Sequence, residues 1–372
     1  MESHIARLRG YAQEKVTAAR SRIVENIRRR GQSLVLDVAL PGAAYFSVAA
    51  GGMADVLHYL GEDVVRVDRF IGASGGACSL FLLLANEPQV RSPQEHGHLC
   101  PSAELLLRGY LEYADSQGHN SILRAFNGFV QGVVGVTSFW ERKYRDILQN
   151  ASAWDAIRSR AFVAVSADPL KLGKRGREVL EAPCDNYIFH SFANREQAVQ
   201  AFVATGEATA RGFLVGIRVH QTVELGQAAP EEQSFTVQEV AGGLKSVTLP
   251  RSFCDGGHPT SLQSLPMPVG SSAKSLLYYV TWFEEMRDAA FCTPESVATL
   301  YKRGVDRTIE CLCNDDLYAY GDAGEANTVK KDKMVIIGAD EVLKRRLAMV
   351  SREGSLQGGA FVNLSEHKVI IA

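Results

Sequence analysis

Hydrophobic residues recur at helical spacing at the start of the chain. Between residues 2 and 30, an apolar residue returns at steps of three and four positions: Ile5, Leu8, Ala12, Val16, Ala19, Ile23 and Ile27. This spacing places the apolar side chains on one face of an α-helix and the polar side chains on the other. The sequence therefore predicts one long amphipathic helix at residues 2–30.

The pattern then changes to apolar runs that alternate with helical stretches. Residues 33–42 and 62–72 are rich in β-branched and apolar side chains, which is typical of buried strands. Residues 47–61 have helical spacing, and residues 76–86 predict an apolar helix. The order strand, helix, strand, helix is the start of a parallel sheet covered by helices.

The rest of the chain predicts more strands and then mainly helices. Apolar runs indicate strands within residues 161–170, 186–192, 212–220 and 245–257. After Ser271 the pattern is mainly helical, with helix starts at Thr293 and Asp340. We predict an α/β fold with a mostly parallel central sheet flanked by helices. Its parts are an N-terminal helix (1–32), a main domain (33–270) and a mainly helical C-terminal extension packing on the core (271–372).

Composition and charge exclude several classes of function. The chain has 372 residues, 46% hydrophobic and 22% charged, which is ordinary for a globular protein with a large core. The net charge of −2 does not indicate a nucleic-acid partner. The apolar runs are too short to span a bilayer, and the N-terminus has no apolar signal-peptide core.

The cysteines favour a reducing compartment, and we expect a cytoplasmic protein. There are seven cysteines, an odd number, and their spacing is not that of a zinc site. Cys311 and Cys313 lack a second pair of ligands. His96, His98 and Cys100 form a dense group of possible ligands, but their segment contains proline and glycine, which favours a solvated loop. We expect no metal site.

The polar face of the N-terminal helix is basic. Its cationic residues outnumber its three glutamates: Arg7, Arg9, Lys15, Arg20, Arg22, Arg28, Arg29 and Arg30 stand against Glu2, Glu14 and Glu25. A basic amphipathic helix can lie on an anionic membrane surface, or it can dock its apolar face on the main domain. Both interpretations stay open. A transit peptide for an organelle is a third, and the glutamates argue against it.

A serine between glycines marks the candidate chemistry. Gly72-Ala73-Ser74-Gly75-Gly76 lies between a predicted strand and a predicted helix and fits G-x-S-x-G. A nucleophile on such a turn needs small neighbours, and the helix start directs N–H groups at a developing oxyanion. Ser74 is therefore a candidate nucleophile, with a packed core corner as the alternative. In the main domain, one strand and one helix precede the strand that leads to Ser74, whereas several strands do so in an ordinary α/β-hydrolase.

With two further segments, this turn gives the chain a resemblance to the patatin-like phospholipase family. The stretch "GAAYFS" at residues 42–47 has the position of the family's glycine-rich oxyanion loop, and Asp255-Gly256-Gly257 matches its D-G-G/A motif. A lesser similarity is the small-residue segment at 201–213. The resemblance covers about residues 33 to 270.

The resemblance implies a patatin-like α/β/α sandwich and a lipid acyl hydrolase that needs no cofactor. Ser74 would attack a carboxylic ester, Asp255 would accept its proton, and water would hydrolyse the acyl-enzyme. The substrate would be a phospholipid or acylglycerol at a membrane or lipid-droplet surface, with the protein peripherally associated. The backbone N–H groups that would stabilise the oxyanion are those of Gly42, Ala43, Ala44 and Gly75. The remaining motif residues are glycines: Gly72, Gly76, Gly256 and Gly257.

Two alternatives stay open. The loop departs from the family pattern G-x-G-x-x-G, because Ala44 and Ser47 replace glycines and no basic residue is present. A catalytically weak or inactive lipid-binding protein of the same fold is compatible with this change. A Ser-His-Asp esterase would instead use His258 or His367 as its base, although the few strands before Ser74 argue against it.

Overall fold

A computed structural model describes most of the regular structure of the chain. The described residues are 1–30, 34–40, 42, 47–86, 102–116, 139–167, 186–206, 223–224, 233–239, 243–248, 252–255, 275–280, 292–313, 333–338 and 360–369. The predicted strand at 212–220, the predicted helix after Asp340 and the group of His96, His98 and Cys100 lie outside these residues.

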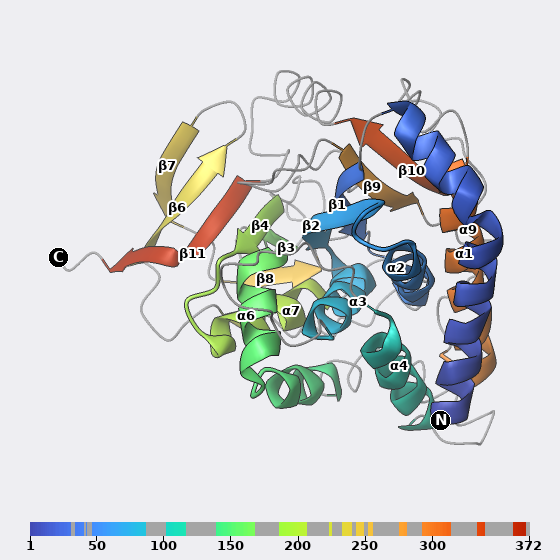
Figure 1. The fold of residues 1–372 in the computed structure, drawn as a ribbon. Helices are drawn as coiled ribbons and strands as arrows, with labels where there is room; N and C mark the ends of the chain where they lie inside the picture. The colour runs from blue at the N-terminus through green and yellow to red at the C-terminus, as the bar shows by residue number, and fades with distance from the viewer. Residues whose placement is uncertain are drawn as a thin grey trace, which may run out of the picture.

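One mixed sheet runs through the molecule (Figure 1). Four parallel strands form its centre in the order β9-β1-β2-β3: β9 (Ser275–Val280), β1 (Leu34–Leu40), β2 (Val65–Gly72) and β3 (Ala161–Ala167). The order continues beyond β3 through β4 (Asn186–His190), β11 (Ala360–Val369), β6 (Gln233–Glu239) and β7 (Gly243–Thr248), and β10 (Lys333–Gly338) pairs with β9 at the other end. Two short strands, β8 (Ser252–Asp255) and β5 (Val223–Glu224), complete the sheet beside β3. The predicted α/β class is confirmed.

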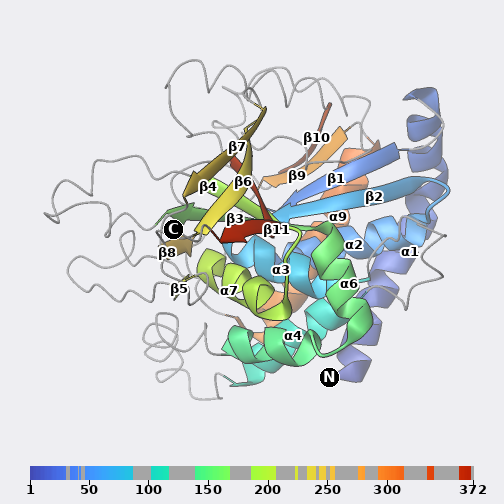
Figure 2. The same ribbon diagram turned by 90° about the vertical axis from the view of Figure 1, so that its left-hand side faces the viewer.

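Helices pack against this sheet. Figure 2 shows α2 (Ala49–Leu60), α3 (Ser74–Ala85) and α7 (Arg195–Gly206) beneath it. α6 (Ala151–Arg160) contacts α3, and α4 (Glu104–Ser116) packs beyond α3. The predicted strand–helix–strand–helix order at residues 33–86 is confirmed, since β1, α2, β2 and α3 occupy those segments.

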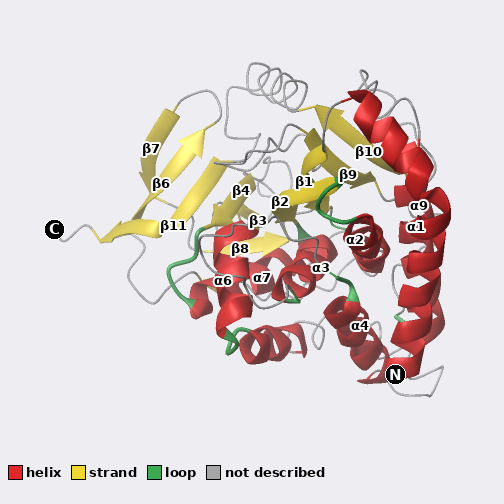
Figure 3. Ribbon diagram, in the orientation of Figure 1, coloured by secondary structure: helices red, strands yellow, loops and turns green. Residues whose placement is uncertain are grey.

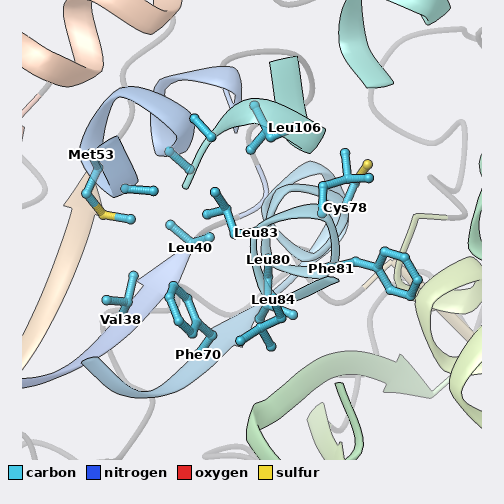
Figure 4. Close-up of a cluster of buried hydrophobic side chains, with 14 of the residues drawn as sticks. Val38, Leu40, Met53, Phe70, Cys78, Leu80, Phe81, Leu83, Leu84 and Leu106 are labelled. Atoms are coloured by element: carbon cyan, nitrogen blue, oxygen red, sulfur yellow. The ribbon is translucent and has the colours of Figure 1, made fainter. Parts of the chain in front are cut away.

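The core lies between the sheet and these helices. Figure 4 shows side chains of β1 and β2 next to side chains of α2 and α3, and the labelled aliphatic and aromatic residues among them are at most 2% exposed: Val38, Leu40, Met53, Phe70, Leu80, Phe81, Leu83 and Leu84. α3 is apolar all round because the sheet covers one side and α4, α6 and α7 cover others. The helix that follows the candidate nucleophile is therefore fixed on several sides.

The N-terminal helix is confirmed, and its apolar face is buried in the protein. α1 (Glu2–Arg30) packs on α2 and α9 (Pro294–Cys313). The residues of its predicted apolar stripe that the core contains are Ile5, Leu8, Ala12, Val16, Ile23 and Ile27. Burial of each larger aliphatic side chain stabilises by about 1.5–3 kcal/mol, more than the ~1 kcal/mol that one basic residue gains near an anionic membrane. The apolar face of α1 is therefore buried against the main domain. No helix in the described part of the chain is both long and apolar enough to span a bilayer.

The prediction of a mainly helical C-terminal extension was wrong for the residues that the structure describes. α9 is helical as predicted from Thr293, but β9, β10 and β11 belong to the same sheet as β1 to β4. β9 and β10 lie at one end of the sheet and β11 lies nearer the other (Figure 3). Strands β9, β10 and β11 therefore belong to the main sheet, and they pair with segments that lie far away in the sequence.

Candidate active site

The chain makes a sharp turn between β2 and α3, and Ser74 lies on it. β2 ends at Gly72 and α3 begins at Ser74, with Ala73 between them in an extended conformation. Ser74 has a φ of 51°, in the left-handed region that residues other than glycine rarely adopt. Such a conformation costs about 1–3 kcal/mol and persists only where the surrounding structure holds it. This is the conformation that a nucleophile on a strand-to-helix turn requires.

Neighbouring strands hold the turn in place. Gly72 pairs with Leu40 of β1 on one side and with Val163 of β3 on the other. The Ala73 N–H donates to Leu40 O at 3.1 Å, which extends the pairing to β1 by one residue. The strained residue therefore follows directly on a backbone that is fixed from both sides.

Gly72 is a glycine because α3 folds back over it. A Cβ at this position would lie 2.9 Å from Ala77 Cα and 3.0 Å from Ala77 N. Both are backbone atoms of the first turns of α3, so they yield only if the helix moves. The first glycine of the motif thus allows the helix to start immediately above the end of the strand.

Thr205 supplies the contact that holds Ser74 itself. The Ser74 N–H donates to Thr205 Oγ1 at 2.9 Å, and the Thr205 hydroxyl donates to Ala164 O of β3 at 2.6 Å. Thr205 is fully buried in the last turn of α7. Sequence reasoning missed this residue: it lies in the small-residue segment 201–213, but nothing local distinguishes it from any other threonine in a helix.

The start of α3 offers further backbone donors. The first N–H groups of a helix have no partner within it, and the helix dipole places partial positive charge there. Ala73, at the N-cap, provides no side-chain acceptor. Thr205 takes the Ser74 N–H, and the next two amides belong to Gly75 and Gly76, which carry no side chain to obstruct an approaching atom. The predicted donor Gly75 therefore lies at a helix N-terminus suited to a developing oxyanion.

One end of the predicted oxyanion segment follows β1, and the other end is hydrogen-bonded to α3. Gly42, half-buried, follows the end of β1, the strand that pairs with Gly72. At the other end, Ser47 O accepts a hydrogen bond from the Ser79 hydroxyl of α3 at 2.8 Å. The segment is thus tied to β1 and to the nucleophile helix. Ala43 and Ala44 lie outside the described residues.

The register of the sheet brings Asp255 to the same place. Val165 of β3 pairs with Tyr187 of β4 on one edge, so its other partner, Asp255 of β8, lies on the edge that β2 occupies. Gly72 pairs with Val163 on that edge, only two residues away, or ~7 Å along the strand. β8 therefore ends, at Asp255, where β2 would continue if it did not turn at Ser74.

The topology places one of the rival bases, His367, away from Ser74. β3 and β4 lie between β2 and β11, which places β11 three strand spacings or ~14 Å from β2. Residues 360–363 of β11 pair with β4, and His367 lies further along, toward the end of the sheet away from Asp255. The structure thus does not bring His367 to Ser74. Gly256, Gly257 and His258 lie outside the described residues.

Comparison with known proteins finds no match to a family model, to a curated protein or to a solved structure. Among the residues that the structure describes, no group of three or more His, Cys, Asp or Glu side chains is placed to hold a metal ion.

Proposed function

We propose that the protein is a serine acyl hydrolase of the patatin-like type, which cleaves carboxylic esters of lipids through Ser74 and Asp255. The observation that carries the proposal is the φ of 51° at Ser74, on a strand-to-helix turn with G-x-S-x-G sequence. The position of Asp255, beyond the end of β2 on the same edge of β3, supports its role as the partner of Ser74. The lipid class of substrate rests on the resemblance of the sequence motifs.

The reaction would proceed in two halves. Asp255 accepts the proton of Ser74 Oγ while that oxygen attacks the ester carbonyl, and the oxyanion that forms is stabilised by N–H groups at the start of α3 and in the segment 42–47. Asp255 then donates this proton to the leaving alcohol oxygen, and the acyl-enzyme remains on Ser74. Water attacks this ester while Asp255 accepts one of its protons. When the acyl–oxygen bond breaks, the fatty acid leaves and the proton returns from Asp255 to Ser74 Oγ.

Replacement of the nucleophile tests the proposal. Ser74→Ala should lower the hydrolysis of short-chain and phospholipid esters at least ~1,000-fold, because no other group can form the acyl-enzyme. Circular dichroism and thermal melting check that the variant is folded. A folded Ser74→Ala protein with wild-type turnover would overturn the proposal. A wild-type protein that binds lipid vesicles but hydrolyses none of these esters would favour the non-catalytic alternative.

A second pair of variants identifies the base. Asp255→Asn should cost about 100-fold or more in turnover because an amide cannot accept the proton, whereas His258→Ala should cost about tenfold or less. If His258→Ala is as inactive as Asp255→Asn, a Ser-His-Asp triad replaces the dyad.

A further inference from the structure

We propose that Thr205 is a positioning residue of the active site, whose hydroxyl holds the nucleophile in its strained backbone conformation. The inference rests on the proposed function, since it takes Ser74 as the nucleophile. It concerns a residue to which the resemblance assigns no role, within the small-residue segment 201–213 and 131 positions from Ser74 along the chain. The Thr205 hydroxyl joins the nucleophile turn to the neighbouring strand β3.

Thr205 differs from other helical threonines in the partner of its hydroxyl. Thr17, Thr299 and Thr308 each donate to the carbonyl four residues earlier in their own helix. This local bond is the usual one for a threonine inside a helix. Thr205 instead donates to Ala164 O in β3 and accepts from Ser74 N. Its hydroxyl thus serves as acceptor and donor between two other elements.

The bond to Ser74 satisfies the first amide of α3. An N-cap side chain would accept from the second or third amide of the helix, so the N–H of Ser74 needs an acceptor from another element. With that acceptor on α7, the peptide plane before Ser74 is directed at Thr205. A left-handed Ser74 needs such an external partner, because its own backbone favours a different conformation.

α7 holds the hydroxyl rigidly. The Phe202 ring packs against Phe81 of α3 in an edge-to-face contact, with centroids 4.9 Å apart, and against Tyr144 at 5.6 Å. The β-branched side chain of Thr205 is itself restricted in χ1, so its Oγ1 has little freedom. The hydroxyl therefore acts as a fixed point to which Ser74 is tied.

Three variants separate the hydroxyl from the rest of the side chain. Thr205→Val keeps the shape and removes the hydroxyl, whereas Thr205→Ser keeps the hydroxyl. We expect Thr205→Val to lower kcat about 10- to 100-fold with KM changed less than about threefold, and Thr205→Ser to stay within about threefold of wild type in both. Thr308→Val is the matched control, because Thr308 is equally buried but bonds within α9, and it should leave kcat unchanged.

Hydrogen exchange at the Ser74 amide provides a readout that does not depend on activity. Overlapping peptides analysed by mass spectrometry should show that exchange at Ser74 becomes at least about tenfold faster in Thr205→Val and stays close to wild type in Thr205→Ser and Thr308→Val. A purely structural role would instead change the melting temperature without selective exchange at Ser74.

The outcomes distinguish this inference from the proposed function. If wild-type hydrolysis depends on Ser74 but Thr205→Val retains kcat and Ser74 exchange, the positioning role is overturned and the proposed function stands. If Ser74→Ala retains activity, the proposed function fails and the catalytic role of Thr205 fails with it. Reduced kcat and faster exchange in Thr205→Val, both rescued in Thr205→Ser, support the inference.

Discussion

The turn at Ser74 and the crossing of α2 with α9 both bring backbones into contact through glycines, but only the turn holds a strained residue. At the crossing, a Cβ on Gly304 would lie 1.9 Å from Ala49 O, and one on Gly52 would lie 2.1 Å from Tyr301 O. At the turn, a Cβ on Gly72 would lie 2.9 Å from Ala77 Cα, and Ser74 follows with its φ of 51°.

This difference separates stability from chemistry. The α2–α9 crossing allows two helices to approach closely, and α1 packs over both of them. At the turn, Ser74 itself has the unfavourable backbone conformation, and the contacts of the turn with β1, β3 and Thr205 maintain this conformation. Changes at the crossing should therefore lower stability without changing turnover per folded molecule, and changes at the turn should lower turnover per folded molecule as well.

The largest effect on stability is expected at the crossing. In Gly304→Ala the new methyl group would collide with the backbone of α2, so the free energy of unfolding should fall by about 3 kcal/mol or more. Urea denaturation measures it. Gly10→Ala in α1 is the control, because nothing lies within 4 Å of a Cβ there and alanine favours the helix by ~1 kcal/mol. Equal stability of Gly304→Ala and wild type would show that the crossing is looser than described.

A change at the turn should mainly affect turnover. In Gly72→Ala the first turn of α3 must shift by a few tenths of an ångström, which moves Ser74 and the N–H groups beside it. We expect kcat to fall about 10- to 100-fold, with a loss of only about 1–3 kcal/mol in stability. Gly206→Ala, next to Thr205 but with open space around its Cβ, should leave kcat unchanged. Unchanged kcat in Gly72→Ala would remove the distinction between the two regions.

A smaller effect on stability is expected where α1 packs against α2. The buried carboxylate of Asp55 accepts hydrogen bonds from the Tyr301 hydroxyl at 2.6 Å, the Ala103 N–H at 2.9 Å and Arg9 Nε at 3.3 Å. Burial and the neighbouring Asp55 raise the pKa of Tyr301, so its hydroxyl stays protonated and donates. Arg9 is partly exposed, with 21% of its side chain accessible, which limits its contribution.

Arg9→Met should therefore lower the free energy of unfolding by about 1–2 kcal/mol, because it leaves the Asp55 charge with neutral donors only. Turnover per folded molecule should stay at the wild-type level. The exposed Arg22→Met is the control and should change stability by less than about 0.5 kcal/mol. A drop in kcat for Arg9→Met at full folding would mean that α1 acts on the chemistry as well.

The smallest effect concerns lipid surfaces. With its apolar face buried, α1 can attract a membrane only through exposed side chains such as Arg22 and Arg28. Arg28→Gln should weaken binding to anionic vesicles by ~1 kcal/mol at low salt, and the difference should vanish at high salt. Gln13→Ala on the same exposed side is the control. Equal binding of Arg28→Gln and wild type would leave α1 with a docking role alone.

The sequence predicted the segments that carry strong local patterns. The long helix, the order of β1, α2, β2 and α3, and the turn at Ser74 follow from periodicity and from small residues at fixed spacing. β9, β10 and β11 were missed because an apolar run alone does not distinguish a strand from a buried helix segment, and the partners that pair with these strands lie far away in the sequence.

Candidate residues divide in the same way. Ser74 and Asp255 belong to motifs, but only the register of β3 shows that Gly72 and Asp255 share one edge. Thr205 lies in the small-residue segment 201–213, but nothing local indicates its role, because this role arises from two hydrogen bonds to segments far away in the chain. Local patterns thus mark the residues proposed to react, whereas the residues that hold them in place can be identified only from the fold.

Covalent labelling of Ser74 tests the central claim most directly. The folded wild-type protein is treated with a fluorophosphonate, which reacts with activated serines, and the labelled peptide is identified by mass spectrometry. We predict a single label on Ser74, none in Ser74→Ala, and a rate reduced about 100-fold or more in Asp255→Asn. A label on another serine that persists in Ser74→Ala, together with hydrolysis that persists, would contradict the account.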